Sequence, residues 1–177
     1  RKDLEDRLVE ISRRYGVAYV GPNCLGAINN FSGMNTFFIP EHRTSIIEEP
    51  NGIGIISQSG GLGLEIIEMM KADNMKLGKL VSIGNASGVG LPEILDSMGD
   101  DPNISVIAIY LEGIKNGKHF RQSGKKVKKK TPVIVIKGGV GGGAEATLSH
   151  TASLAGNGEA FSACCRRRCT LWRTSSR

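Results

Sequence analysis

The chain has 177 residues, 40% apolar and 23% charged, which is typical of one globular domain or slightly more. The net charge of +6 is concentrated in the last 14 residues, which hold five arginines and no acidic residue. The remaining residues carry about +1, so the nucleic-acid-binding class is not expected. No apolar run approaches the roughly 18–20 residues of a membrane span, and the first residues lack a secretion signal. Cys24 is the one cysteine outside the tail, so a reducing, cytoplasmic setting is expected.

The first third of the chain is predicted to contain a helix, a strand and an irregular segment. Residues 1–15 repeat apolar side chains on one helical face and end at a glycine, which is typical of a helix stop. Residues 17–20 are predicted to form a short buried strand. Residues 27–50 contain many Asn, Gly and Pro residues, so they are predicted to be irregular, with a domain boundary near 50–52.

After that boundary, apolar runs alternate with helical patterns. The predicted strands cover residues 53–56, 80–83, 106–111 and 132–136, and the predicted helices cover 62–70, 91–98 and 117–130. Continuous apolar strands separated by helices predict a parallel sheet that is covered by helices on both faces. Such sheets bind ligands beyond the carboxyl ends of their strands, so the loops that follow the strands are predicted to form the binding site.

The first of these loops, Ser57–Gly61, leads directly into a predicted helix. Free backbone N–H groups and the positive end of the helix dipole favour an anion there. The alternative is an N-capping serine, Ser59, on a tight turn without a ligand. The loop is neither a Walker loop nor a nucleophile elbow, because it lacks both sequence patterns.

A histidine and a glutamate are the other candidates for chemistry. His150 follows a glycine-rich stretch, and a neutral imidazole can accept a phosphoryl group; the alternative is a polar loop residue. Glu112 follows the third strand, where a carboxylate can orient a histidine; the alternative is a solvated loop acid. His42 and His119 are interpreted as surface residues. The lysine run 125–130 is interpreted as a solvated helix face.

Five motifs in chain order resemble the NDP-forming acyl-CoA synthetases, which are relatives of the succinyl-CoA synthetase alpha subunit. The resemblance covers about residues 1–162 and depends on their order and spacing more than on any one motif. The motifs are VGPNCLG (20–26), GIISQSGG (54–61), SIGN (82–85), YLEGI (110–114) and SHTASLAG (149–156).

The resemblance implies a reversible reaction in three steps. An acyl-CoA reacts with phosphate to give an acyl phosphate and free CoA; the phosphoryl group passes to a histidine and then to ADP or GDP. By motif position the phosphohistidine is His150, and Glu112 is the glutamate that supports it. The helix that begins at Ser59, Gly60 and Gly61 is implied to hold the phosphoryl group. Asn23 and Cys24 are candidates for lining the CoA site, although a buried turn cysteine is an equally good interpretation of Cys24.

The resemblance also implies fold, domains and partners. Residues 51–163 are expected to form a flavodoxin-like α/β domain, preceded in 1–50 by the C-terminal end of a Rossmann-like CoA-binding domain plus linker. The Gly-rich CoA-binding strand-turn-helix that precedes this region in the family is missing here, so the chain is expected to be an incomplete fragment of the synthetase. An ATP-grasp domain or beta subunit is expected to bind ADP or ATP with Mg. CoA and a small carboxylic acid are the expected substrates.

The tail, residues 164–177, departs from the family pattern. It has no apolar period, which suggests a frameshifted or disordered end, and its three cysteines lack paired zinc-ligand spacing, so no metal site is expected.

Two alternatives to the enzyme remain. A non-catalytic, CoA-sensing regulatory module of an acetyltransferase fusion would be expected to lack the active histidine, so the presence of His150 favours the enzyme. A flavodoxin-like mononucleotide binder is based on fold analogy alone. The acyl group and the choice between ADP and GDP do not follow from the sequence.

Overall fold

The structure, a computed structural model, describes residues 2–39, 50–138 and 170–171. The helices are α1 (Lys2–Tyr15), α3 (Gly60–Ala72), α4 (Leu91–Gly99) and α5 (Gly117–Val127). The strands are β1 (Ala27–Asn29), β2 (Met34–Asn35), β3 (Ile53–Ser57), β4 (Lys79–Ser82), β5 (Val106–Leu111), β6 (Val133–Lys137) and β7 (Thr170–Leu171). Within these residues no helix has both the length and the apolar character that a membrane span requires.

The predicted parallel sheet is confirmed. The described strands form a sheet of order β2-β1-β4-β3-β5-β6-β7, in which β4, β3, β5, β6 and β7 run parallel. Numbered from β3, the parallel part has the order 2-1-3-4-5 of a flavodoxin-like sheet. After β3 the chain forms β4 on one side of this strand, and it then crosses over to form β5 on the other side. In sheets of this order the strand order reverses at one point, here between β3 and β5, and ligands bind beyond the carboxyl ends of those two strands.

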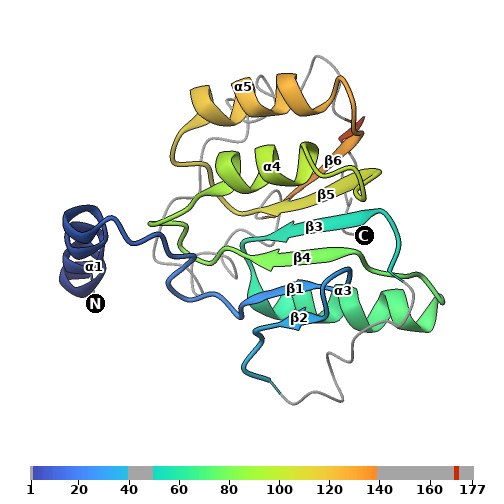
Figure 1. The fold of residues 1–177 in the computed structure, drawn as a ribbon, viewed down its shortest axis with the longest axis horizontal. Coiled ribbons are helices and arrows are strands. Elements are labelled where there is room, and N and C mark those ends of the chain that lie inside the picture. Colours follow the sequence, from blue (N-terminus) through green and yellow to red (C-terminus); the bar gives the residue numbers. More distant parts are fainter. Residues whose placement is uncertain (1, 40–49, 139–169, 172–177) are drawn as a thin grey trace.

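Helices cover both faces of the sheet, as predicted (Figure 1). Side chains alternate along each strand, so neighbouring residues enter different cores. Ile56 and Ile109 pack with α4 and α5, whereas Ile55 and Ala108 pack with α3. The two cores hold the parallel strands in register and thereby fix the positions of the loops at their carboxyl ends.

Two expectations for the first third of the chain are wrong. Residues 27–35 form an antiparallel hairpin, β1 and β2, and β1 pairs antiparallel with β4, so the sheet is mixed. Residues 17–20 form no strand; instead, the carbonyl of Tyr19 accepts a hydrogen bond from the Val89 amide at 2.8 Å. The hairpin was missed because its strands have only three and two residues, too short for an alternating pattern.

The tail contributes one short element. Thr170–Leu171 forms β7, which pairs parallel with β6 and extends the sheet by one strand. This strand lies inside the 164–177 segment for which the sequence predicted no element.

Helix α1 lies beyond the carboxyl end of the sheet (Figure 1). None of its residues is buried, and its apolar side chains Leu4, Leu8 and Ile11 are exposed. Glu5 joins it to the sheet: its Oε2 accepts a hydrogen bond from Asn85 Nδ2 at 2.7 Å, and its Oε1 lies 3.8 Å from Lys115 Nζ. The predicted helix is confirmed, and polar contacts at this edge of the sheet attach it.

Candidate active site

The loop after β3 leads into α3 at the carboxyl edge of the sheet. Ser59 is the N-cap of α3, and its Oγ accepts a hydrogen bond from the Leu62 amide at 3.3 Å. The amides of Gly60 and Gly61 occupy the first two helical positions, where no partner exists inside a helix. Gly61 is exposed, and nothing lies within 4 Å of the position that its Cβ would take. The helix start therefore has both the capping serine of the simpler interpretation and amides that can face an anion.

Gln58 connects this loop to Glu112. Its Oε1 accepts hydrogen bonds from the Glu112 amide at 2.5 Å and from the Gly113 amide at 3.0 Å. The backbone amide of Gln58 donates to the Tyr110 carbonyl at 3.1 Å. Because Gln58 directly precedes Ser59, these bonds hold Glu112 beside the start of α3 at the switch point between β3 and β5.

Lys137, the last residue of β6, contacts Glu112 from the strand on the other side of β5. Its Nζ donates to the Glu112 carbonyl at 2.8 Å and to the Gly138 carbonyl at 2.6 Å. Burial lowers the pKa of Lys137, and the Glu112 carboxylate acts in the opposite direction. Burial raises the pKa of Tyr110, and the Glu112 carboxylate adds to this rise. The Glu112 carboxylate therefore acts electrostatically on both groups.

The turn that holds Asn23 and Cys24 lies against the loop after β4. The Asn85 amide donates to the Pro22 carbonyl at 2.9 Å, and Asn23 Nδ2 donates to Asn85 Oδ1 at 3.2 Å. Asn23 is exposed and Cys24 is half-buried, with its Sγ 3.4 Å from the Val20 carbonyl. The next residue, Leu25, reaches α3: a Cβ on Gly60 would stand 2.7 Å from its Cγ. The structure therefore brings the turn, the loop and the start of α3 together.

Gly84 allows the loop after β4 to lie close to the backbone of the turn at Pro22 and Asn23. It has a φ of +53°, and a Cβ there would stand 2.6 Å from the carbonyl carbon of Asn23. We expect Gly84→Ala to reduce the free energy of unfolding by about 2–4 kcal/mol, because backbone must move and φ is unfavourable. Urea unfolding measures the change.

The matched control is Gly124→Ala, which lies inside α5 with nothing within 4 Å of the added Cβ. This change should raise the free energy of unfolding by about 0.5–1 kcal/mol, because alanine favours the helix. Equal stability of the Gly84→Ala variant and the unchanged chain would show that the turn does not pack on the loop in solution.

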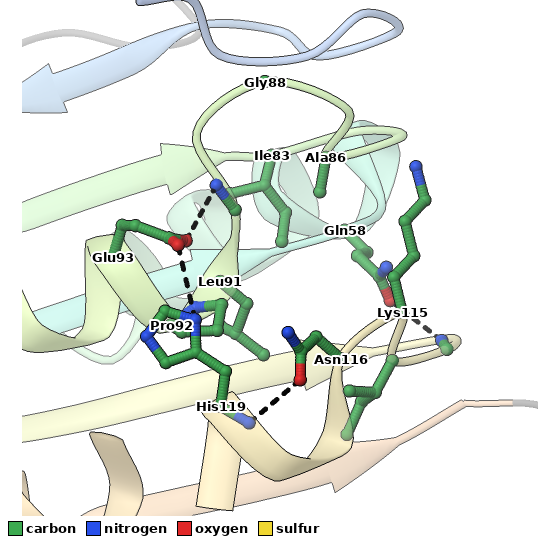
Figure 2. Close-up of a pocket in the computed structure, with 13 residues that line it drawn as sticks. Gln58, Ile83, Ala86, Gly88, Leu91, Pro92, Glu93, Lys115, Asn116 and His119 are labelled. Atoms are coloured by element: carbon green, nitrogen blue, oxygen red, sulfur yellow. Dashed lines mark hydrogen bonds and ion pairs between the residues drawn. The ribbon is translucent and has the colours of Figure 1, made fainter. Parts of the chain in front are cut away.

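A cavity of about 170 Å³ opens at the same edge, beside Gln58 (Figure 2). Figure 2 shows His119 and Glu93 facing each other on one side of it, with His119 Nδ1 3.5 Å from Glu93 Oε1. Glu93 Oε2 also accepts from the Gly90 amide at 3.1 Å, and Asn116 caps α5. The lining residues are Gln58, Ile83, Ala86, Gly88, Gly90, Leu91, Pro92, Glu93, Gly113, Ile114, Lys115, Asn116 and His119. The interpretation of His119 as a simple surface residue is thus incomplete, because it also lines this cavity.

Several predicted residues are not tested by the described structure. His150 and His42 lie outside the described residues. Across residues 2–39 and 50–138, no group of three His, Cys, Asp or Glu side chains could hold a metal ion. At the end of α5, Lys126 is exposed and donates to Asp100 at 2.7 Å, as expected of a solvated helix face.

Gln58 and Lys137 were not predicted as residues of the candidate site. Each long polar side chain marks the carboxyl end of a parallel strand: Gln58 follows β3 directly, and Lys137 is the last residue of β6. That position was the available signal, since the carboxyl ends of the strands were already the predicted ligand edge.

The chain is similar to known proteins along most of its length. Residues 50–175 match the model of the succinyl-CoA ligase like flavodoxin domain, a range that includes most of the tail. The chain is 40% identical, over 93% of its length, to 23% of an ADP-forming acetate–CoA ligase I from Archaeoglobus fulgidus. It is 39% identical, over 92% of its length, to 34% of the alpha subunit of ADP-forming acetate–CoA ligase I from Pyrococcus furiosus.

A solved structure agrees with these matches. It is a dinucleotide-forming acetyl-coenzyme A synthetase 1 of Ca. Korarchaeum cryptofilum in complex with phosphate and ADP. The TM-score is 0.81 at 34% identity, and the match covers 92% of this chain and 34% of that one. The chain thus spans about a quarter to a third of these relatives. With the family match covering residues 50–175, the chain belongs to the family of the succinyl-CoA ligase like flavodoxin domain, as its motifs and strand order indicated.

Proposed function

We propose that the chain is part of an ADP-forming acyl-CoA synthetase, which interconverts acyl-CoA, ADP and phosphate with free acid, CoA and ATP. The observation that supports this proposal is the Gln58 bridge, which joins the loop that leads into α3 to the backbone amide of Glu112 after β5. An anion pocket and a carboxylate at one edge are what a phosphohistidine site requires. The similar ligases named above support the same reaction and do not favour a regulatory module.

The phosphoryl group has a defined path in this proposal. Phosphate attacks the acyl carbonyl carbon of acyl-CoA, the C–S bond breaks, and CoA leaves as the thiol. One imidazole nitrogen of His150 then attacks the phosphorus of the acyl phosphate and releases the carboxylate. Glu112 accepts a hydrogen bond from the other ring N–H and stabilises the positive charge on the phosphorylated ring. The amides of Gly60 and Gly61, with Ser59 as cap, hold the phosphoryl oxygens.

The turn at Asn23 and Cys24 is proposed to line the CoA site. It packs on the loop after β4 and, through Leu25, on the start of α3, so a thiol placed there would lie close to the phosphate amides. Residues 1–50 are proposed as the end of a CoA-binding domain plus a linker, whose hairpin β1–β2 pairs with β4. Residues 51–163 are proposed as the flavodoxin-like domain, to whose sheet residues 164–177 add β7.

The nucleotide is proposed to bind on an ATP-grasp domain or beta subunit, where Mg would accompany it. The cavity beside Gln58, at about 170 Å³, is well below the roughly 300–1,000 Å³ of pockets for drug-sized ligands. The nucleotide is therefore not assigned to this cavity. A small carboxylic acid is the proposed acyl substrate, and the ligases that resemble the chain are named for acetate.

The reaction products test this proposal. The full-length protein, with its partner subunit where that is a separate chain, is incubated with ATP, CoA and acetate. We expect acetyl-CoA together with ADP and phosphate, because a phosphohistidine enzyme transfers only the terminal phosphoryl group. Omitting CoA is the control and should stop net turnover. Release of AMP and pyrophosphate would contradict the proposal, since that route forms an acyl adenylate and needs no phosphohistidine.

A further inference from the structure

The peptide backbone of Glu112 is held from both sides by long side chains of other strands. On the β3 side, Gln58 Oε1 accepts the Glu112 amide at 2.5 Å. On the β6 side, Lys137 Nζ donates to the Glu112 carbonyl at 2.8 Å. A residue just beyond a strand end ordinarily gains freedom as the ladder stops. Both polar groups of the Glu112 backbone are therefore fixed where the regular hydrogen bonding of the sheet ends.

Lys137 also fixes the beginning of the segment that leads to His150. Its Nζ donates to the Gly138 carbonyl at 2.6 Å, and the Gly138 amide donates to the Leu111 carbonyl at 2.7 Å. A Cβ on Gly138 would meet the Tyr110 hydroxyl, so a side chain there would require Tyr110 to move. One ammonium group thus joins the residue after β5 to the residue after β6.

For folding stability alone, a lysine at position 137 is less favourable than a neutral hydrogen-bond donor. Lys137 is only partly exposed, and a charge removed from water needs compensation by partners. Two carbonyl groups and the nearby Glu112 carboxylate supply this compensation. A neutral donor such as Gln could bond to a carbonyl without that cost. The positive charge beside Glu112 therefore points to a role that a hydrogen bond alone does not explain.

We propose that Lys137 is a positioning residue for the phosphohistidine step, which holds Glu112 in the geometry needed for phosphoryl transfer. The inference depends on the proposed function. Lys137 acts through Glu112: it fixes the backbone from which the carboxylate extends and keeps a positive charge beside that carboxylate. A misplacement of a reacting group by about 1 Å can cost about 100-fold in rate, so loss of a positioning residue should slow the step by up to that factor.

The test measures the single-turnover rate at which acetyl phosphate phosphorylates His150 in the full-length protein, because Glu112 is assigned to the step at the acyl phosphate. We expect Lys137→Met to slow this phosphorylation about 10- to 100-fold. Phosphorylation by ATP, which is proposed to bind on another domain, should change much less. Lys137→Arg should recover much of the rate, since it restores charge and donors. Lys130→Met is the matched control: its ammonium is exposed, 3.8 Å from Asp100, and should leave the rate unchanged.

A double-mutant cycle separates a positioning role from general destabilisation. If Lys137 acts through the Glu112 side chain, Lys137→Met should cost much less in a Glu112→Ala background, where no side-chain acceptor remains to be positioned. Additive losses, or a Lys137→Met rate equal to that of the unchanged enzyme, would overturn the inference. Should the Met variant fail to fold, Lys137→Gln replaces it, and a Gln rate equal to that of the unchanged enzyme is again contrary. Absence of any phosphohistidine in the unchanged enzyme would instead reject the proposed function.

Discussion

Replacement of His150 by alanine is expected to abolish phosphorylation of the complete enzyme by ATP. The unchanged enzyme should take up one phosphoryl group that is stable in base and labile in acid, because the P–N bond of a phosphohistidine hydrolyses when the ring is protonated. The alanine variant has no ring nitrogen to receive phosphorus. Incubation with radiolabelled ATP, followed by acid and base treatment of the denatured protein, measures both properties. Overall acyl-CoA formation should be lost together with the label.

His119→Ala is the matched control for this experiment. His119 lies at the same edge of the sheet, where it lines the cavity and faces Glu93 at 3.5 Å, yet it is not among the residues assigned to phosphoryl transfer. The His119→Ala enzyme should therefore keep its label. Label that persists in the His150→Ala enzyme, or disappears only with His119, would refute the assignment of His150.

The parallel sheet could be predicted because its strands are continuous apolar runs. Ile107, Ile109 and Leu111 face one core, while the alternate residues of β5 point to the opposite face of the sheet, where Ala108 packs on the other core. Such strands are buried on both faces and read clearly in one sequence. The hairpin of residues 27–35 could not be predicted in this way. Its pairing with β4 depends on a long-range contact that leaves no local pattern.

The candidate site was predictable in position and only partly in detail. The rule for strand ends selects Ser59 and Glu112 from the sequence, and the Gln58 bridge joins the loops that follow the neighbouring strands β3 and β5. The roles of Gln58 and Lys137 were not predictable, since they depend on which carbonyl or amide a long side chain reaches. The assignment of His150 stays a prediction, because it lies outside the described residues.

Replacement of Glu112 by glutamine is expected to slow formation of the phosphohistidine by about 100-fold or more. The variant isolates the charge of the carboxylate, because the hydrogen bonds from Gln58 and Lys137 go to the backbone amide and carbonyl of residue 112. These contacts should survive the change. A neutral amide can still accept a hydrogen bond from the imidazole, but it cannot stabilise the positive ring that forms on phosphorylation. Single-turnover phosphorylation by acetyl phosphate measures the loss, because Glu112 is assigned to the step at the acyl phosphate.

Glu65→Gln, on the exposed surface of α3, removes a carboxylate of the same type and should leave the rate unchanged.

Tyr110 gives an independent measure of the charge that Glu112→Gln removes. The Glu112 carboxylate contributes to the raised pKa of Tyr110, so its neutralisation should lower that pKa towards the ordinary value. A pH titration of tyrosine absorbance, with Tyr110→Phe to identify the signal, follows this shift. A Glu112→Gln enzyme that shows the shift in the Tyr110 pKa but phosphorylates at the unchanged rate would show that the carboxylate is ionised at this site and unnecessary for phosphoryl transfer.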